Sequence, residues 1–285
     1  TKDGLNRYNG TDFYVFRPVK GDKNSLYNNN IGTICGDKQG HIYIRCKYAV
    51  VEYDIKKNTF HTIRDNDIQA ITYDNARLWV CTRDSLFTYN RVEDRLDYYY
   101  NLEGVRMSCV TEDSAGNLYV GTMNNGLYMI DHNKKWLNYF PKKDITCIYE
   151  DSKKSIWVGT KDDGLFRLDR NGGITNYGTA PHQNMLSSSY VRCVVEDNLG
   201  NYWIGTFKGL DKLDVTTGTF THYSKDNKPY SLSNSSIICM MKDRQGTFWI
   251  GTYYGGVNLF NPDYEIYTYY YPDESQNCLL YTSDA

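Results

Sequence analysis

The sequence predicts an all-β fold, a β-propeller built of four-stranded antiparallel blades. First, a short motif recurs at intervals of about 40 residues, a period typical of propeller blades. Second, short alternating segments bounded by turn residues surround each copy, and no stretch shows a helical period. Third, Tyr is abundant, with 28 residues in 285, and aromatic side chains favour strands.

The repeated motif is an apolar residue, an aromatic residue, an aliphatic residue, Gly and Thr. The best copies lie at 202–206 and 248–252, and weaker ones at 156–160, 118–122, 78–82 and 42–46. The aromatic residue of each copy stands at positions 43, 79, 119, 157, 203 and 249. We expect each copy to be the second strand of a blade. Their shared register predicts that the Trp residues belong to the core between blades rather than to sugar-stacking platforms.

The first strand of each blade is the apolar segment just before the motif, which ends in Asp. The best copies carry Asp113, Asp197 and Asp243, each followed three residues later by Gly, whereas the copy with Asp151 has Lys154 at the Gly position. Asp at the start of a turn and Gly at its end are typical of β-turns. These carboxylates are therefore interpreted as turn residues of a tight hairpin, not as catalytic groups.

The third and fourth strands follow a Gly-Leu pair and a polar turn. This half of the repeat occurs seven times, but the first two strands occur six times. Residues 1–5 match residues 206–210 in spacing, so Thr1 is expected to end a missing second strand. We expect seven blades over residues 1–275, the first one incomplete. A solenoid is the alternative, but solenoid repeats of this length are mostly helical.

Composition narrows the functional classes. Hydrophobic residues make up 40% and charged residues 23%, which is typical of a globular domain. The net charge of −2 offers no basic excess for nucleic acid, and no apolar run is long enough for direct membrane contact. Cys and His lack metal-ligand spacing, and no nucleophile motif is present, so we expect no cofactor, no metal and no catalytic residue.

Four cysteines stand at one equivalent position of the first strand, four residues before the turn Asp. They are Cys109, Cys147, Cys193 and Cys239. Free Cys packs as a small hydrophobic residue, so we expect these side chains to be buried and reduced. We also expect them to be too far apart for disulfides.

The pattern apolar-Asp-x-x-Gly-x-x-Trp-Ile-Gly-Thr-x-x-Gly-Leu resembles the two-component regulator propeller repeat, and the resemblance runs from residue 1 to about 275. It implies a periplasmic sensor region of a hybrid histidine kinase, as in Bacteroidetes that forage on polysaccharides. In such receptors a further propeller, an immunoglobulin-like domain, a membrane helix and a cytoplasmic kinase accompany the propeller. An oligosaccharide ligand and a homodimer are expected, with no catalysis by the propeller itself.

The tail departs from the repeat. Residues 278–285 resemble a translated sequencing adaptor, which predicts that the tail, 276–285, is not native. The alternative is a native first strand with Asp284 as its turn residue.

We expect the ligand on the side of the blades that carries the loops after the second and fourth strands, because these loops vary while the other turns are regular. The long connections after the fourth strand are 17–30, 178–189 and 224–235. Loop positions taken as equivalent on successive blades give the candidate ligand-binding residues, which are Arg83, Asn124, Lys161, Phe207 and Tyr253. Their mixture of aromatic, amide and basic groups suits a saccharide, including an acidic one.

Two other classes stay open. A propeller enzyme, a polysaccharide lyase or glycoside hydrolase, needs paired acid–base groups, and two facing carboxylates or a Tyr, His and Arg cluster at the inner mouth of the channel would favour it. A pure protein–protein interaction scaffold needs neither.

Overall fold

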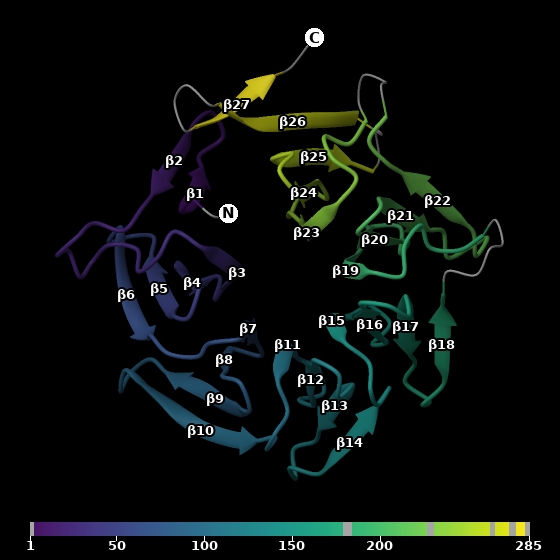
Figure 1. Ribbon diagram of the computed structural model, residues 1–285, viewed down its shortest axis with the longest axis horizontal. Coiled ribbons are helices and arrows are strands. Elements are labelled where there is room, and N and C mark those ends of the chain that lie inside the picture. Colours follow the sequence, from purple (N-terminus) through teal and green to yellow (C-terminus); the bar gives the residue numbers. More distant parts are fainter. Residues whose placement is uncertain (1–2, 179–183, 227–230, 263–265, 274–277, 283–285) are drawn as a thin grey trace. The chain divides into compact units, whose positions relative to one another are not determined.

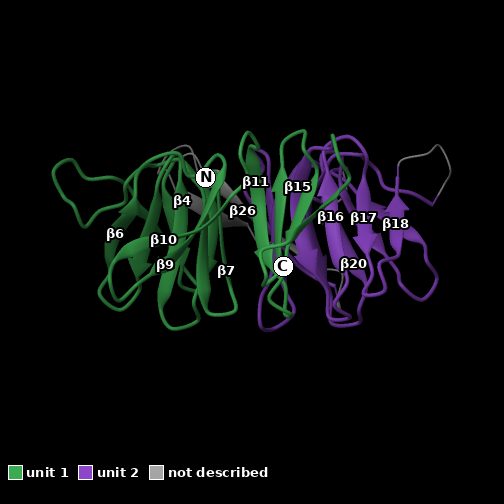
Figure 2. Cartoon of the chain, turned by 90° about the horizontal axis from the view of Figure 1, so that it is seen from below, with its two compact units in different colours: residues 1–142 green, residues 143–285 purple. Residues whose placement is uncertain are grey.

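The computed structural model describes residues 3–178, 184–226, 231–262, 266–273 and 278–282 (Figure 1). The chain divides into two compact units, residues 1–142 and 143–285 (Figure 2). In both units every strand pairs antiparallel with the next strand along the chain within its sheet. Among the described residues, no helix is long and apolar enough to span a membrane.

Unit 1 contains a two-stranded sheet and three four-stranded sheets. The two-stranded sheet is β1 (Leu5–Tyr8) and β2 (Phe13–Phe16). The next sheet comprises β3 (Ile31–Gly36), β4 (His41–Cys46), β5 (Val50–Asp54) and β6 (Thr59–Arg64). It is followed by β7 (Ala70–Asp74), β8 (Arg77–Cys81), β9 (Ser85–Asn90) and β10 (Arg95–Asn101). The last consists of β11 (Met107–Glu112), β12 (Leu118–Thr122), β13 (Leu127–Ile130) and β14 (Trp136–Tyr139).

Unit 2 contains three sheets. The first comprises β15 (Ile145–Glu150), β16 (Ile156–Thr160), β17 (Leu165–Leu168) and β18 (Ile174–Tyr177). The second comprises β19 (Val191–Glu196), β20 (Tyr202–Thr206), β21 (Leu210–Leu213) and β22 (Phe220–Tyr223). The third comprises β23 (Ile237–Lys242), β24 (Phe248–Thr252), β25 (Val257–Asn261), β26 (Ile266–Asp273) and β27 (Cys278–Thr282).

These sheets are the blades of an all-β propeller, and the strand register confirms the repeat. The motif forms the second strand of each of the six complete sheets, as predicted. The sheet of β1 and β2 holds only a third and a fourth strand, which agrees with an incomplete seventh blade. In the tail, β27 pairs with β26 at the outer side of its sheet, a pairing that the sequence did not indicate.

A buried Asp–Trp contact explains the six-residue spacing within the motif. In the sheet of β19, one carboxylate oxygen of Asp197 accepts the backbone N–H groups of Leu199 and Asn201, at 2.9 and 2.8 Å. The other oxygen accepts the indole N–H of Trp203 at 3.0 Å. The same contact joins Asp151 to Trp157 and Asp243 to Trp249. The turn Asp therefore closes the hairpin and fixes the Trp ring at once, and the interpretation as turn residues is confirmed.

Three of the four motif Trp residues are buried in the cores, as predicted, whereas Trp249 is only partly buried. Trp79, Trp157 and Trp203 are at most 1% exposed, whereas Trp136, on an outer strand, is 51% exposed. The core around Trp203 includes Ile237 and Phe248 from the next sheet of unit 2. These large rings fill the space between sheets together with aliphatic side chains.

The four equivalent cysteines correct one expectation. All four are free thiols, but Cys239 is exposed and the other three are only partly buried. The register explains why, because each Cys lies opposite the motif Gly on the innermost pair of strands, as Cys193 does opposite Gly205. Only the thiol is enclosed, and burial raises the pKa of Cys109 to about 12.

Candidate ligand-binding surface

A backbone contact positions the loop that follows the second strand. In the three sheets of unit 2, the first residue of this loop donates its N–H to the carbonyl of a residue just before the first strand of the same sheet. These pairs are Lys161 with Asp144 at 3.1 Å, Phe207 with Tyr190 at 3.0 Å, and Tyr253 with Ser236 at 2.9 Å. Each sheet of unit 2 therefore presents two neighbouring loop side chains at one end, one from each loop.

The predicted site residues are divided between the two units. Arg83 and Asn124 lie in unit 1, and Lys161, Phe207 and Tyr253 lie in unit 2. The backbone pattern also corrects the alignment of Asn124. Met123 donates its N–H to the carbonyl of Arg106 at 2.8 Å, so Met123 is the residue equivalent to Lys161, and Asn124 follows it.

In unit 2, Phe207 and Tyr253 flank a residue that the sequence reasoning missed, Arg192. The guanidinium carbon of Arg192 lies 4.6 Å from the ring centre of Tyr190 and 5.2 Å from that of Phe207. The two rings are stacked, with centres 6.2 Å apart and planes 13° apart. Nη1 of Arg192 donates to Ser236 Oγ and to the carbonyl of Ile237, both at 2.9 Å. Arg192 thus bridges two neighbouring sheets.

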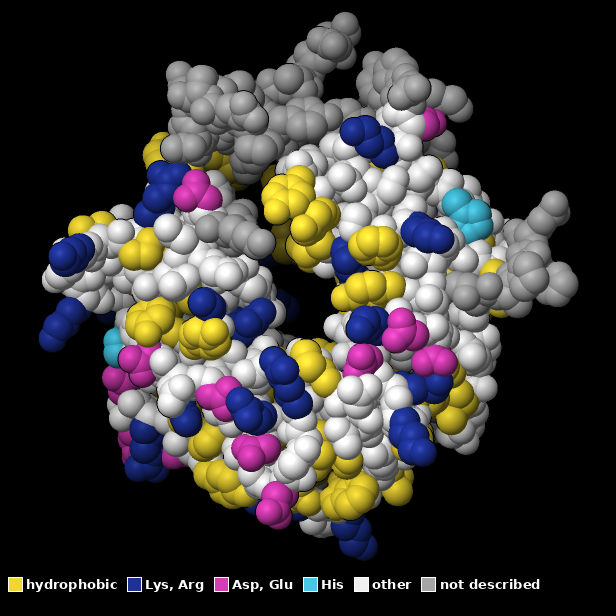
Figure 3. Space-filling model, viewed as in Figure 1, with side chains coloured by type: hydrophobic (Ala, Val, Ile, Leu, Met, Phe, Trp, Pro, Cys, Tyr) yellow, Lys and Arg dark blue, Asp and Glu magenta, His cyan; other side chains and the backbone are white. Residues whose placement is uncertain are grey.

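Tyr253 lies near this bridge. It is 49% exposed, and its ring centre is 4.3 Å from that of Tyr254, which is 78% exposed. A hydrogen bond with Tyr254 raises the pKa of Tyr253, while the nearby positive charge of Arg192 acts in the opposite direction. We call Tyr190, Arg192, Phe207, Tyr253 and Tyr254 the aromatic–arginine surface. Figure 3 shows hydrophobic side chains beside Lys and Arg over β19, β23 and β24.

A β-bulge places Arg192 on this surface. Val191 pairs with Thr206 and Cys193 with Gly205, so Arg192 is an extra residue without a partner in β20. The equivalent extra residues are Ser108, Thr146 and Ile238. Bulges reorient a side chain out of the regular alternation. The sequence signal was a charged residue directly before an aligned Cys, which no other sheet has.

Lys161 does not join this group. Its ammonium lies 4.0 Å from a carboxylate oxygen of Asp144, the residue directly before β15. Asp163, on the same loop, pairs with Lys143 at 2.6 Å. This end of the β15 sheet is a set of partly exposed ion pairs, which contribute little to stability and stay accessible to polar ligands.

The aromatic–arginine surface combines two modes of recognition. A guanidinium has five N–H donors, and the contacts with Ser236 and Ile237 use only Nη1 of Arg192. Nε and Nη2 have no protein acceptor among the described residues and form a planar fork that matches a carboxylate. The exposed faces of Phe207 and Tyr253 offer apolar platforms next to that fork.

A buried carboxylate anchors the long connection that leads to this surface. Asp211 is fully buried, and one of its oxygens accepts the N–H and the hydroxyl of Ser187, both at 2.9 Å. Its other oxygen lies 2.7 Å from Nδ1 of His222. Burial raises the pKa of Asp211 above its ordinary value of 3.8, against the opposing effect of these hydrogen bonds. In the last sheet, Asn258 takes this place: its Oδ1 accepts the N–H of Ser233, and its Nδ2 donates to the hydroxyl oxygen of Ser233, both at 2.9 Å.

We expect Asp211→Asn to stabilise the chain at neutral pH by about 1 kcal/mol, the scale of a single hydrogen-bond change. A raised pKa in the folded state means that the carboxyl group costs stability once the pH rises above the unfolded value near 3.8. The gain should therefore vanish at low pH and grow toward neutral pH. Urea unfolding across this pH range checks it, and a gain independent of pH would contradict the assignment.

Comparisons with known proteins agree with the repeat. The two-component regulator propeller family matches residues 139–162, 185–208 and 231–254, which end on the loops of Lys161, Phe207 and Tyr253. The chain carries two-component regulator propeller repeats. A comparison with curated proteins by sequence finds no match.

Three solved structures illustrate the fold. The extracellular domain of a hybrid two-component system from B. thetaiotaomicron is 18% identical, with a TM-score of 0.50, over 100% of this chain and 56% of that one. Virginiamycin B lyase from Staphylococcus aureus, as a catalytically inactive variant with quinupristin, is 15% identical, with a TM-score of 0.69, over 88% of each chain. PorZ of Porphyromonas gingivalis is 15% identical, with a TM-score of 0.65, over 91% of this chain and 43% of that one.

The chain is a propeller that resembles the extracellular sensor domains of hybrid two-component systems. It spans 44–58% of the length of the B. thetaiotaomicron extracellular domains that it matches. Likeness to the lyase is a likeness of fold. Among the described residues, no cluster of three or more His, Cys, Asp or Glu side chains could hold a metal ion.

Proposed function

We propose that this chain is a non-catalytic, ligand-sensing module in the periplasmic region of a hybrid histidine kinase receptor, and that its ligand is a glycan fragment. The regulator propeller repeats support the signalling role. In the whole receptor, a second propeller, an immunoglobulin-like domain and a cytoplasmic kinase would accompany the chain, and a homodimer would transmit the signal.

The aromatic–arginine surface is the observation that carries the glycan proposal. Sugar rings bind proteins through apolar C–H faces on aromatic rings and through hydroxyl groups that need fixed polar partners. Phe207 and Tyr253 supply the first kind of contact, and the unused N–H groups of Arg192 supply the second. A carboxylate on the sugar would occupy the guanidinium fork with both oxygens, so we propose an acidic oligosaccharide.

Phe207→Ala should weaken binding of an acidic oligosaccharide such as oligogalacturonate by about tenfold, because an aromatic contact is worth about 1 kcal/mol or more. The variant removes a ring that is 51% exposed and leaves the bonds of Arg192 to the next sheet intact, so the melting temperature should change little. Arg192→Gln should weaken binding further and reduce its dependence on salt. Titration by calorimetry measures both effects.

Arg170→Gln is the matched control, because Arg170 is an exposed turn residue outside the aromatic–arginine surface. Equal affinities for Phe207→Ala, Arg192→Gln and the control would exclude this surface as the glycan site. Appearance of shortened or unsaturated sugars in the same mixtures would instead favour the polysaccharide enzyme. Absence of any glycan binding, together with a signalling defect of the variants in the receptor, would favour the interaction scaffold.

A further inference from the structure

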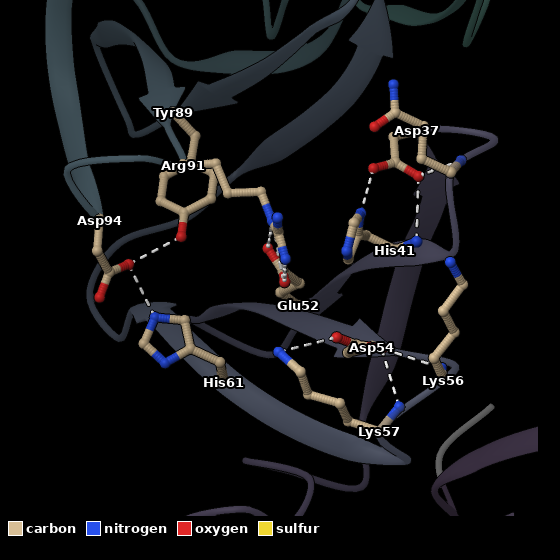
Figure 4. Close-up of polar contacts among 11 residues, drawn as sticks. Asp37, His41, Glu52, Asp54, Lys56, Lys57, His61, Tyr89, Arg91 and Asp94 are labelled. Carbon is tan, nitrogen blue, oxygen red and sulfur yellow. Dashed lines mark hydrogen bonds and ion pairs between the residues drawn. The ribbon is translucent and has the colours of Figure 1, made fainter.

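A polar cavity lies on unit 1, between the sheet of β3–β6 and the sheet of β7–β10. Its volume is about 330 Å³, and β5, β6, β9 and the turn before β10 contribute its walls. This is at the lower end of the roughly 300–1,000 Å³ range of small-molecule sites. The cavity lies at the end of the sheets that carries the turns after the first and third strands, where the sequence indicated only regular turns. Figure 4 shows its side chains.

The charged groups around the cavity are paired with one another. Arg91 holds the buried carboxylate of Glu52 through two nitrogens, with Nη2 at 2.9 Å and Nε at 3.1 Å. Asp94 accepts the hydroxyl of Tyr89 at 2.8 Å and lies 2.8 Å from Nε2 of His61 (Figure 4). On a third side, the ammonium of Lys57 lies 3.4 Å from Asp54.

These pairs leave single polar atoms for a ligand. The contacts of Asp94 with His61 and Tyr89 both use Oδ1, so Oδ2 remains an acceptor. Arg91 contacts Glu52 through Nε and Nη2, so Nη1 remains a donor. The Tyr89 hydroxyl donates to Asp94 and retains its lone pairs. The walls thus offer donors and acceptors side by side, without an uncompensated charge.

The residue opposite the motif aromatic differs from sheet to sheet, and beside this cavity it is an acid. In the first two sheets of unit 2 the residue opposite the motif aromatic is a cation. Arg167 lies 5.7 Å from the ring centre of Trp157, and Lys212 lies 5.4 Å from that of Trp203. In the sheet of β3–β6 this residue is Glu52, and it lies opposite Tyr43. The acid cannot cover the ring as a cation does, and it instead binds Arg91 of the next sheet.

We infer that this cavity is a binding site for a small, neutral, polyhydroxylated ligand of the monosaccharide class, separate from the aromatic–arginine surface. An ionic ligand would bring an extra charge into a cavity whose own charges are already paired, and drawing Arg91 away from the buried Glu52 would be costly. Hydroxyl groups donate and accept at once, so they use Asp94 Oδ2, Arg91 Nη1 and the Tyr89 hydroxyl without disturbing any pair.

The test is saturation-transfer NMR of the chain with free galactose, mannose, xylose and fucose at millimolar concentration, and with galacturonate and galactosamine as charged counterparts. We expect at least one neutral sugar to bind more tightly than either charged sugar. Asp94→Asn should weaken that binding by about tenfold, because a hydrogen bond to a carboxylate is stronger than one to an amide. Asn is also suited to the left-handed backbone at this position, where φ is 49°.

Asp97→Asn is the matched control, because Asp97 lies on β10 next to the cavity and pairs with Arg95 at 2.7 Å instead of lining it. Tyr89→Phe, which keeps the ring and removes the hydroxyl, should also weaken binding. The inference is overturned if no neutral sugar binds, if a charged counterpart binds more tightly, or if Asp94→Asn and Asp97→Asn bind equally. Phe207→Ala should leave this binding unchanged, which separates it from the proposed glycan surface.

Discussion

Replacing Asp151 with Ala is expected to lower the free energy of unfolding by about 3–5 kcal/mol, since each buried donor left without an acceptor costs about 1–3 kcal/mol. Asp151 is 3% exposed. One oxygen accepts the indole N–H of Trp157 at 2.8 Å and the hydroxyl of Tyr202, from the next sheet, at 2.7 Å. The other accepts the N–H of Ser155 at 2.8 Å. Burial, and then Asp151, raises the pKa of Tyr202, so the phenol remains a donor.

Asp169→Ala provides the comparison for this effect. Asp169 also accepts two turn N–H groups, from Asn171 and Gly173, but this turn is exposed to water. Its loss should therefore cost less than about 1 kcal/mol, because water replaces the acceptor. Urea unfolding of both variants measures the difference. Similar losses for Asp151 and Asp169 would show that the turn, and not the bridge between Trp157 and Tyr202, supplies the stability.

Gly205→Ala is expected to cost about 2–3 kcal/mol through overpacking. A Cβ atom at Gly205 would lie 2.5 Å from the sulfur of Cys193 and 2.6 Å from Cγ2 of Ile237, which belongs to the next sheet. Both neighbours belong to inner strands that pack closely, so neither can withdraw freely. Truncating Cys193 to Ala in the same chain should recover only part of the loss, because Ile237 still blocks the position.

Gly251 offers an internal test of this reasoning. A Cβ atom there would meet only the sulfur of Cys239, at 2.9 Å, so Gly251→Ala should cost less, about 1 kcal/mol. Adding Cys239→Ala should restore the stability. The chain already contains this solution, since Cys81 replaces the motif Gly in β8 and lies opposite Ala70. A double variant no more stable than Gly251→Ala would disprove steric conflict as the cause.

The strands were predictable from the sequence because the same pattern of four strands recurs in each repeat. A single copy such as residues 42–46 is ambiguous, but its register with 202–206 identifies it as β4. The Asp turns and the buried Trp residues follow from local chemistry that recurs in several sheets. The exposure of Cys239 was not predictable in the same way, because an equivalent position says which strand a residue occupies and not how closely a neighbour covers it.

The functional surfaces were harder to predict because they depend on departures from the repeat. Phe207 and Tyr253 were found as variable loop residues, and the structure places both near Arg192. Arg192 itself stands inside a strand, and only the pairing register shows that it is an extra residue. Glu52 was missed because a single acid in a strand forms no sequence pattern, and because its partner Arg91 lies 39 residues away in the sequence.

The bulges on the first strands have a consequence for how such repeats vary. Ser108, Thr146, Arg192 and Ile238 occupy one slot per sheet, and the partner strand makes no demand on that slot. Residues with a hydroxyl, a cationic and an aliphatic side chain already occupy these positions in this chain. Substituting a bulge residue therefore changes that side chain while the hydrogen-bonded pairing of the sheet stays the same. Recognition can therefore vary at these positions without a change in strand pairing, although a side chain such as Arg192 also bonds the next sheet.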